Sequence, residues 1–331
     1  MSINTGDTLK IWFVDFWGGF EFDDNYFYYL LDAAYNVELD KENPDVLFFS
    51  ADPWRKIERD LFKDTDAKKV FYTIESVPPL FDASTYPPPF TIRTKKNGKL
   101  ISCSEGAGYR DYFYSQCDFA LTHTVTDDPR HFRFPYWSYQ IDWFDKQDYG
   151  PIETDFLLPE NQITNNQYIS TAKTKFCSHV FHNEWQNPRF EMHEKLSEYK
   201  QVDGFGSHFD EHINGYGAKY NLYKDYKFVI CFENAIREGY HTEKLFHAKT
   251  AGAVPIYWGH SSVSNDFNPV SFINLNDFES VDALVERIKE IDQDDSLYQQ
   301  YVDAPLFTGG AVADKFKPAA VLDFFQKTIL A

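Results

Sequence analysis

A polar segment between two apolar stretches contains the residue types that bind an anion. Residues 231–259, CFENAIREGYHTEKLFHAKTAGAVPIYWG, read as a strand, a short connection, a helix and a second strand. In an open parallel α/β sheet, ligands bind beyond the carboxyl ends of the strands, where a helix start offers free N–H groups and partial positive charge. Lys244 falls in the first turn of this helix, where a cation is normally unfavourable. A bound phosphate would neutralise both Lys244 and the positive end of the helix. The alternative is that Thr242 simply caps the helix and Lys244 is solvated.

The same segment offers groups for the rest of a nucleotide or a sugar. Glu243 could accept hydrogen bonds from hydroxyls, and Tyr240 could cover a base or a ribose. The chain contains neither G-x-G-x-x-G nor G-x-x-x-x-G-K-[ST], which argues against the usual dinucleotide site and the P-loop. The stretch VDGFGSH, residues 202–208, is predicted as a loop that could approach a ligand or form a simple turn.

Metal and hydrolase chemistry has little support in the sequence. The ten histidines form no H-E-x-x-H, and no G-x-S-x-G is present. His241 and His247 are predicted at the rim of the binding pocket and on the helix surface. The acidic stretches TDDP (126–129) and DQDD (292–295) are predicted as solvated loop acids. We therefore predict no metal site.

Strands that alternate with helices indicate a parallel α/β sheet in each half of the chain. The predicted strands cover residues 9–17, 44–50, 68–76, 117–124, 175–181, 226–234, 253–258 and 271–277. The predicted helices cover residues 23–35, 54–63, 187–200, 243–251, 281–291 (capped by Ser280) and 317–330. The polar stretch 147–168 is the predicted boundary, giving domains 1–150 and 151–331, with the last helix free to pack back on the first domain. Two Rossmann-like domains with the active site in the cleft between them are the simplest arrangement.

Composition narrows the class of protein. With 331 residues the chain exceeds the size at which single cores usually split. A net charge of −19 argues against nucleic acid or an anionic membrane as the main partner. Four scattered cysteines predict buried reduced thiols in a cytosolic protein. Neither a signal peptide nor a membrane-spanning run is predicted.

Aromatic residues make up 18% of the chain, and several lie among polar neighbours in DFWGGFEFDDNYFYYLL, residues 15–31. Flat rings beside carboxylates and amides suit sugar recognition, and they also suit ordinary packing. Both interpretations stay open on composition alone.

The polar segment of residues 231–259 and its surroundings also carry a family resemblance. YKFVICFEN followed by Y-x-TEKLFHAKTAGAVPIYWG, and then SSVSNDFNPVSFINLNDF, resembles the donor-binding motif of the α1,3/α1,4-fucosyltransferases, particularly the bacterial members. VFYTIES and DFWGG resemble shorter parts of the same family. The resemblance is specific over residues 224–292 and looser elsewhere. It implies a GT-B fold, GDP-fucose as the donor and inversion at the anomeric carbon.

By this resemblance, the residues that hold GDP-fucose are Arg189, Asn234, Tyr240, Glu243 and Lys244. Arg189 and Lys244 would face phosphate, and Glu243 would face hydroxyls of the ribose or the fucose. No tightly bound cofactor is implied, and a divalent metal is not expected to be essential.

The resemblance also assigns the catalytic base to Glu75. Its neighbours Ile74 and Ser76 depart from the Gly-Glu-Asn of bacterial members, although the glutamate is retained. Trp17 and Glu21 in the aromatic segment are the candidates for acceptor binding.

The resemblance therefore implies a fucosyltransferase acting on the GlcNAc or glucose of a Gal-GlcNAc type acceptor, such as N-acetyllactosamine or lacto-N-biose. Its product would be a Lewis-type glycan, as on lipopolysaccharide, with α1,3 linkage and α1,4 linkage still open. The alternatives are a GT-B enzyme with another nucleotide sugar and a non-catalytic carbohydrate-binding protein. We expect a cytoplasmic protein, with peripheral attachment to the inner membrane and the oligomeric state left open.

Overall fold

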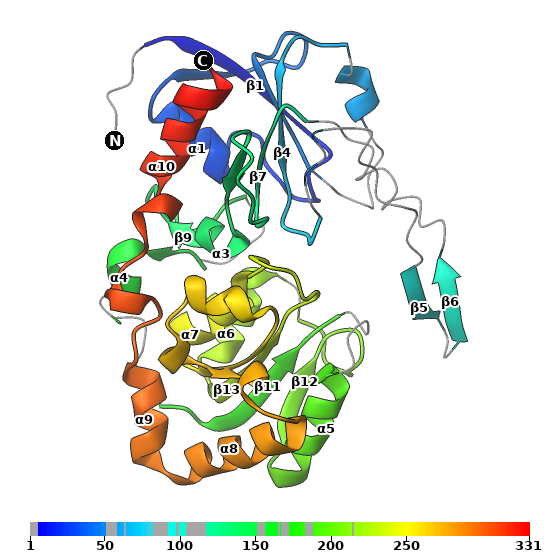
Figure 1. The fold of residues 1–331 in the computed structure, drawn as a ribbon, viewed down its shortest axis with the longest axis vertical. Coiled ribbons are helices and arrows are strands. Elements are labelled where there is room, and N and C mark those ends of the chain that lie inside the picture. The colour runs from blue at the N-terminus through cyan, green and yellow to red at the C-terminus, as the bar shows by residue number, and fades with distance from the viewer. Residues whose placement is uncertain are drawn as a thin grey trace. The chain divides into compact units, whose positions relative to one another are not determined.

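The computed structural model describes residues 6–50, 58–62, 64–77, 79, 81, 92–96, 99–103, 117–150, 156–164, 166, 172–182, 188–213 and 215–331. The chain divides into two compact units (Figure 1). Unit 1 comprises Met1–Tyr139, Tyr149–Ile152 and Ala313–Ala331, and unit 2 comprises Gln140–Asp148 and Glu153–Val312. The end of the chain therefore belongs to the same unit as its beginning. The roles assigned to the two predicted domains stay predictions.

Unit 1 contains a six-stranded parallel sheet with the order β2-β1-β3-β4-β7-β8. Its strands are β1 (Thr8–Val14), β2 (Asn36–Leu39), β3 (Val46–Phe49), β4 (Lys68–Tyr72), β7 (Phe119–Thr122) and β8 (His131–Arg133). Its helices are α1 (Tyr26–Asp32), the short 3-10 helix η1 (Arg59–Phe62), α3 (Tyr136–Tyr139) and, at the chain end, α10 (Pro318–Phe324), which continues as a π-helix to Ile329. Two further strands, β5 (Ile92–Lys96) and β6 (Lys99–Cys103), form a separate antiparallel pair.

Buried aromatic rings form the core of unit 1. The ring of Phe48 on β3 lies 5.0 Å from that of Phe13 on β1 and 5.1 Å from that of Phe27 on α1. Phe325, near the end of the chain, places its ring 5.7 Å from Phe48. Much of the aromatic content of the sequence is therefore explained by ordinary packing in this unit.

Unit 2 contains a five-stranded parallel sheet with the order β12-β11-β13-β14-β15. Its strands are β11 (Lys175–Val180), β12 (Val202–Phe205), β13 (Tyr226–Phe232), β14 (Val254–Trp258) and β15 (Ile273–Asn274). Its helices are α4 (Glu160–Thr164), α5 (Pro188–Tyr199), α6 (Tyr216–Tyr223), α7 (Glu243–Thr250), α8 (Val281–Gln293) and α9 (Asp295–Asp303). A short parallel pair, β9 (Ile141–Asp142) and β10 (Leu158–Pro159), completes it.

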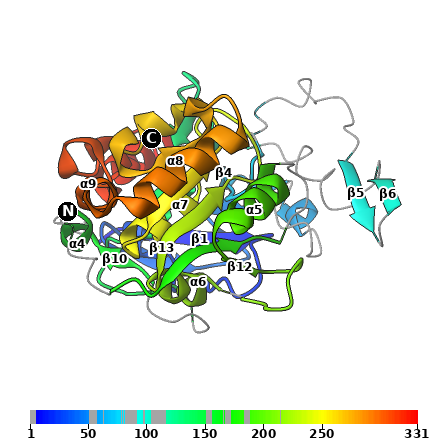
Figure 2. The ribbon, with the colours of Figure 1, turned by 90° about the horizontal axis from the view of Figure 1, so that it is seen from below.

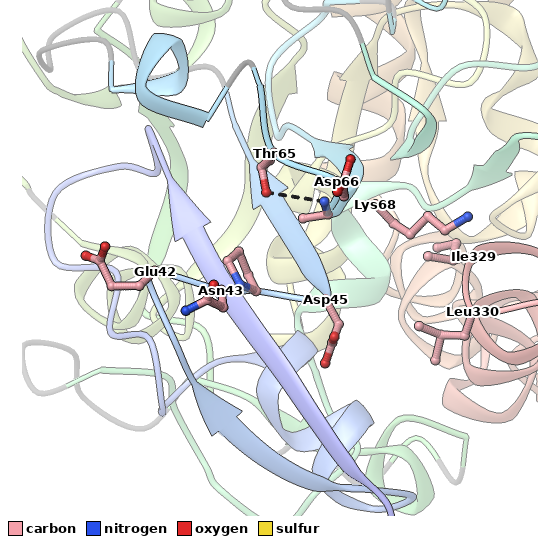
Figure 3. Close-up of a pocket in the computed structure, with 10 residues that line it drawn as sticks. Glu42, Asn43, Asp45, Thr65, Asp66, Lys68, Ile329 and Leu330 are labelled. Carbon is pink, nitrogen blue, oxygen red and sulfur yellow. Dashed lines mark hydrogen bonds between the residues drawn. The ribbon is translucent and has the colours of Figure 1, made fainter.

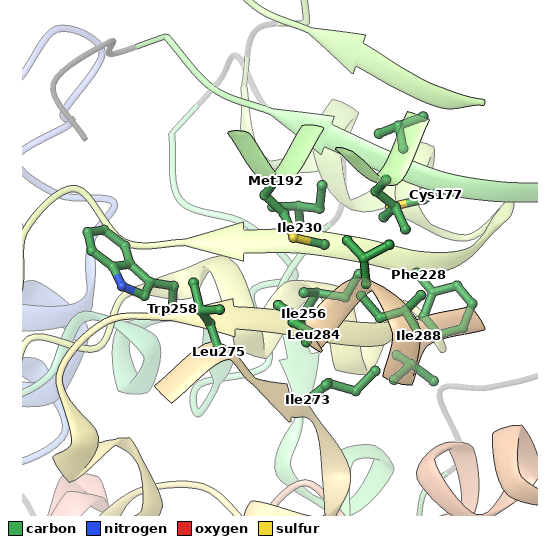
Figure 4. Close-up of a cluster of buried hydrophobic side chains, with 14 of the residues drawn as sticks. Cys177, Met192, Phe228, Ile230, Ile256, Trp258, Ile273, Leu275, Leu284 and Ile288 are labelled. Atoms are coloured by element: carbon green, nitrogen blue, oxygen red, sulfur yellow. The ribbon is translucent and has the colours of Figure 1, made fainter. Parts of the chain in front are cut away.

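Helices cover both faces of the unit 2 sheet, as a buried parallel sheet requires. Alternate residues of β13, Phe228 and Ile230, join Met192 of α5 and Leu284 of α8 in one apolar cluster (Figure 4). Figure 2 shows α5 and α8 side by side over this face. Cys231 points to the opposite face, where its thiol contacts the backbone of α7. Because successive side chains of β13 point to opposite faces of the sheet, one set packs on α5 and α8 and the other on α7.

Several local predictions are wrong. VDGFGSH is not simply a loop, because its first four residues form β12. Asp292 is not a solvated acid: its carboxylate is buried and paired with Lys200 at 2.6 Å and Lys227 at 2.7 Å. By contrast, Ser280 caps α8 as predicted, since its hydroxyl accepts the N–H of Ala283. Among the helices within the described ranges, none is long and apolar enough to cross a membrane.

Candidate functional site

The polar segment of residues 231–259 lies at one edge of the unit 2 sheet. β13 ends at Phe232, and the chain passes through Glu233 and Asn234 before α7 begins at Glu243. Because the five strands are parallel, their carboxyl ends meet at this edge, where open α/β sheets bind ligands. The predicted order of strand, connection, helix and strand is confirmed.

A fully buried carboxylate, Glu233, ties the end of β13 to the start of α7. Its Oε1 accepts the backbone N–H of Thr242 at 2.8 Å. Its Oε2 accepts the Thr242 hydroxyl at 2.7 Å and the Lys244 ammonium at 3.1 Å. A carboxylate buried without partners would be very unfavourable, and these three donors compensate for its lost hydration. Glu233 therefore fixes the position of the helix start.

The predicted cap of α7 takes a different form. Thr242 has the extended backbone of an N-cap residue, but its side chain makes no capping hydrogen bond, since the hydroxyl donates to Glu233. Burial disfavours the charged form of Lys244, yet Glu233 and Glu243 outweigh burial and raise the pKa of the ammonium. Its Nζ also donates to Thr242 Oγ1 at 3.0 Å. An anion does neutralise Lys244, and Glu233 supplies that anion from within the protein.

Lys244 retains capacity for a ligand. An ammonium has three donors. Within the described residues, that of Lys244 donates to Glu233 and to Thr242, which leaves one donor available on a side chain that is 20% exposed. This lysine is therefore held in place rather than solvated, and it can still donate to an incoming anion.

Arg189 and Asn234, both predicted at the donor site, are hydrogen-bonded to each other. Arg189 Nη2 donates to Asn234 Oδ1 and to the carbonyl of Phe232, each at 2.8 Å. Arg189 lies in the first turn of α5 and is 1% exposed. Burial lowers the pKa of its guanidinium, and Glu233 and Tyr240 oppose that shift. The arginine thus places a buried positive charge at the end of β13.

Glu243 is paired with a lysine that sequence reasoning missed. Lys219 of α6 places its Nζ 3.1 Å from Glu243 Oε1. Burial alone would raise the pKa of this carboxyl, but Lys219, and after it Lys244, hold that pKa well below its usual range. Glu243 is therefore a charged hydrogen-bond acceptor at the start of α7.

The histidines near α7 are not where the sequence placed them. His241 is 1% exposed, with Nδ1 2.6 Å from Asp266 Oδ2, so it does not lie at an exposed rim. His247 is also 1% exposed and is surrounded by the rings of Phe156, Tyr216 and Tyr220. Burial lowers the pKa of His247 to about 3, so it is neutral at pH 7. Both imidazoles belong to the interior of unit 2.

Tyr240 is 2% exposed and lies between Gly239 and His241. A ring so deeply buried presents little surface to a ligand in this state, so its predicted role of covering a base or a ribose stays a prediction. Its backbone N–H donates to the carbonyl of Arg237 at 3.1 Å, which shapes the turn before α7.

Gly259 follows β14 and leaves room for Glu233. A Cβ at this position would overlap the Tyr257 hydroxyl and would lie 3.0 Å from Glu233 Cγ. A larger residue would therefore clash first with Tyr257 and would also crowd Glu233, which holds Thr242 and Lys244.

Unit 1 brings two of its predicted site residues to the same edge of its own sheet. Trp17 follows the carboxyl end of β1, and its ring centroid lies 6.2 Å from that of Tyr72 at the end of β4. Glu75 lies three residues beyond Tyr72, in a turn where its N–H donates to Thr73 Oγ1 at 3.1 Å. Glu75 is half-buried, and Glu21 is exposed. Glu75 thus lies just after β4, which ends at Tyr72, whereas the predicted strand of residues 68–76 includes it.

Within the described part of the chain, no group of three or more His, Cys, Asp or Glu side chains could hold a metal ion. A cavity of about 520 Å³ in unit 1 is lined by Asn43, Asp45, Thr65, Lys68 and Ile329, among others (Figure 3). It lies at the amino ends of β3 and β4, opposite the edge that carries Glu75. We therefore assign it no part in the site.

Two sequence families match the chain. Residues 169–304 match the family described as glycosyltransferase family 10 (fucosyltransferase) C-term, and residues 11–140 match the α-(1,3)-fucosyltransferase FucT N-terminal domain. The second match includes Glu75, and the first includes all five predicted donor residues.

Individual relatives match over different lengths. The α-(1,3)-fucosyltransferase FucT of Helicobacter pylori is 28% identical, over 100% of this chain and 67% of the relative. A provisionally named fucosyltransferase of Acanthamoeba polyphaga mimivirus is 34% identical, over 44% of this chain and 26% of the relative. The 4-galactosyl-N-acetylglucosaminide 3-α-L-fucosyltransferase 9 of Mus musculus is 33% identical, over 45% of this chain and 43% of the relative. The chain thus spans from a quarter to two thirds of the length of these relatives.

Solved structures match the whole chain. A crystal structure of an α1,3-fucosyltransferase covers 100% of this chain and 92% of its own, with a TM-score of 0.72 and 24% identity. A crystal structure of an α1,3-fucosyltransferase with GDP-fucose covers the same shares, with a TM-score of 0.68 and 24% identity. This likeness establishes the fold, and the predicted GT-B architecture is confirmed.

Proposed function

Because the chain belongs to the fucosyltransferases of glycosyltransferase family 10, we propose that it transfers L-fucose from GDP-fucose to an oligosaccharide acceptor. The acceptor would be the GlcNAc or glucose of a Gal-GlcNAc type glycan, and the linkage α1,3. The observation that carries the proposal is the buried charge cluster at the start of α7, in which Glu233 holds Lys244 beside Glu243 and Arg189.

The donor would bind at this helix start. Lys244 has one donor left for a phosphate oxygen, and Arg189 adds a second positive charge close by. Glu243, kept ionised by Lys219, would accept hydrogen bonds from hydroxyls of the ribose or the fucose. Fixed cations need no rearrangement as the leaving diphosphate gains charge, which favours the transition state.

Glu75 would be the general base. The acceptor hydroxyl forms a bond to the anomeric carbon of fucose while the bond from that carbon to the β-phosphate oxygen breaks. The bonding electrons leave with GDP, and the hydroxyl proton passes to the Glu75 carboxylate. This single displacement inverts the anomeric carbon, and a positioned base contributes on the order of 10²–10⁴-fold to such a step.

The acceptor would contact unit 1, where Trp17 offers a ring and Glu21 an exposed carboxylate. Since Arg189 and Lys244 supply positive charge to the diphosphate, we expect transfer to continue in the presence of a chelator. We expect the enzyme to act in the cytoplasm.

A nucleotide comparison and a transfer assay test the proposal together. A nucleotide that binds the native state raises the melting temperature, so GDP should stabilise the protein and UDP and CMP should not. Incubation with GDP-fucose and N-acetyllactosamine should release GDP. Stabilisation by UDP alone would indicate another nucleotide sugar, and binding of the acceptor without release of GDP would indicate a carbohydrate-binding protein.

A further inference from the structure

A chain of three side chains lies beside the proposed donor site. Asp266 Oδ2 is 2.6 Å from His241 Nδ1, and His241 Nε2 is 3.1 Å from Ser262 Oγ. The side chains of Asp266 and His241 are 0% and 1% exposed. An ionised carboxylate only accepts hydrogen bonds, so Nδ1 donates to Asp266 and the ring orientation is fixed.

The order of these groups is that of a hydrolase triad, but the surroundings of Ser262 argue for another role. Its Oγ accepts the backbone N–H of Gly239 at 3.0 Å and lies 2.9 Å from His260 Nδ1. With three partners, the hydroxyl has little capacity to approach a substrate carbonyl as a nucleophile. The same contacts are well suited to hold a loop in place.

The loop held in this way is the one that leads into α7. Ser262 fixes Gly239 through its backbone, and Asp266 fixes His241 through its ring. Tyr240 lies between these two attachment points. On the other side, Glu233 fixes Thr242 and Lys244. Residues 239–244, which include three predicted donor residues, are therefore fastened by two buried carboxylates from separate parts of the chain.

We propose that Asp266, His241 and Ser262 act as positioning residues, which hold residues 239–244 in the conformation that receives the donor nucleotide. The proposal rests on the proposed function for the identity of the ligand. A segment already fixed before binding loses less conformational freedom when the ligand arrives, so affinity should depend on these contacts.

Ser262→Ala tests the proposal with a small change on a half-buried residue, because it removes the hydroxyl from both Gly239 and His241. Ser262→Thr keeps the hydroxyl and should restore the contacts. Ser264→Ala is the matched control, since Ser264 lies with Ser262 in the 3-10 helix η3 (Ser261–Asn265) and, among the described residues, its hydroxyl bonds only to the carbonyl of Ser261. His241→Asn keeps a donor for Asp266 and loses the contact to Ser262.

Two measurements apply to each full-length variant: hydrogen exchange of the amides in residues 239–244, and calorimetric titration with GDP. In Ser262→Ala and His241→Asn, we expect exchange in this segment to be faster by about three- to tenfold, with GDP affinity weaker by a similar factor. Exchange in β11 and β13 should be unchanged, which excludes general unfolding. Ser262→Thr and Ser264→Ala should behave like the unsubstituted protein.

Unchanged exchange in Ser262→Ala, or faster exchange with unchanged GDP affinity, would overturn the proposal. General loss of protection in both Ser262→Ala and His241→Asn would also overturn it, because the residues would then support the whole unit rather than this segment. If the unsubstituted protein bound no GDP, the proposed function would fail, and the exchange data would still decide whether the three residues hold the loop.

Discussion

Lys244 and Glu233 form an ion pair across the start of α7, with Nζ 3.1 Å from Oε2 and the carboxylate fully buried. The pair explains how a lysine is tolerated in the first turn of a helix, next to its positive end. It also means that the ammonium is oriented before any nucleotide arrives. The proposed phosphate contact is thus prepared by a residue that itself need not touch the donor.

Glu233→Gln should therefore destabilise the protein and weaken donor binding together. The amide retains an acceptor for Thr242, but Lys244 loses the stronger of the two carboxylates that stabilise its charge, while Glu243 remains. Breaking a fully buried pair costs about 3–5 kcal/mol. Because Lys244 is 20% exposed and keeps Glu243 as a partner charge, we expect the free energy of unfolding to fall by somewhat less, about 2–4 kcal/mol. Urea unfolding measures this loss, and calorimetry with GDP measures the change in affinity.

The double variant Glu233→Gln/Lys244→Met serves as the control for Glu233→Gln. With both charges removed, part of the lost unfolding free energy should return while GDP binding stays weak. If the single variant unfolds at the same urea concentration as the unsubstituted protein, the ion pair does not hold the helix start.

Lys219→Met should make donor binding sensitive to acid. Of the charged groups around Glu243, Lys219 lowers the pKa of that carboxyl most. Without it, burial raises the pKa of Glu243, so the carboxylate is lost as pH falls. Affinity for GDP-fucose should therefore begin to decline at a higher pH in the variant than in the unsubstituted protein, although Lys244 still lowers the pKa of Glu243 in both. Lys224→Met, at the end of the same helix, is the control; equal pH profiles in all three proteins would refute the role of Lys219.

His247→Leu should reduce the sensitivity of unfolding to acid. Burial lowers the pKa of His247 to about 3 from an ordinary value of 6.5. The unfolded chain therefore binds a proton at a pH where the folded protein does not, and stability falls as pH decreases from 6.5 toward 3. Removing the imidazole removes this loss, which is on the order of a few kcal/mol.

At pH 7 the same substitution should change stability little, because the ring nitrogens of His247 have no hydrogen-bond partner within the described part of the chain. Acid unfolding followed by circular dichroism checks both expectations, with His212→Leu on the surface as the control. An acid midpoint that is the same in His247→Leu and the unsubstituted protein would show that the folded imidazole titrates normally.

Glu75→Gln should abolish most transfer while GDP binding is retained. The amide cannot accept the acceptor proton, so kcat should fall by about 10²–10⁴-fold. Glu38→Gln, an exposed glutamate on β2, is the control for a change of charge in unit 1. Near-normal kcat in Glu75→Gln would assign the base elsewhere.

Sequence reasoning was most accurate where local pattern determines structure. The apolar strands around residues 231–259 and the cap of α8 by Ser280 follow from periodicity and capping chemistry. It was less accurate for VDGFGSH, because two glycines suggest a turn while pairing with β11 overrides that preference. The GT-B fold came from the resemblance of the donor motif.

The interior of the site could not be predicted from spacing. Lys219 lies 24 positions before Glu243, and Asp266 lies 25 positions after His241, so only the folded chain brings these pairs together. Glu233 was visible in the polar segment, but its role depends on the backbone turn that returns Thr242 to it. The sequence suggested an external anion for Lys244, since a fully buried internal one cannot be recognised before the strand and the helix are placed.

Product analysis after incubation with GDP-fucose and N-acetyllactosamine tests the central claim most directly. Nuclear magnetic resonance of the isolated product identifies both the linkage and the anomeric configuration. The proposed function predicts a trisaccharide with fucose α1,3-linked to GlcNAc and one equivalent of released GDP. A protein that binds GDP but forms no fucosylated product with this acceptor, lacto-N-biose or lactose would contradict it.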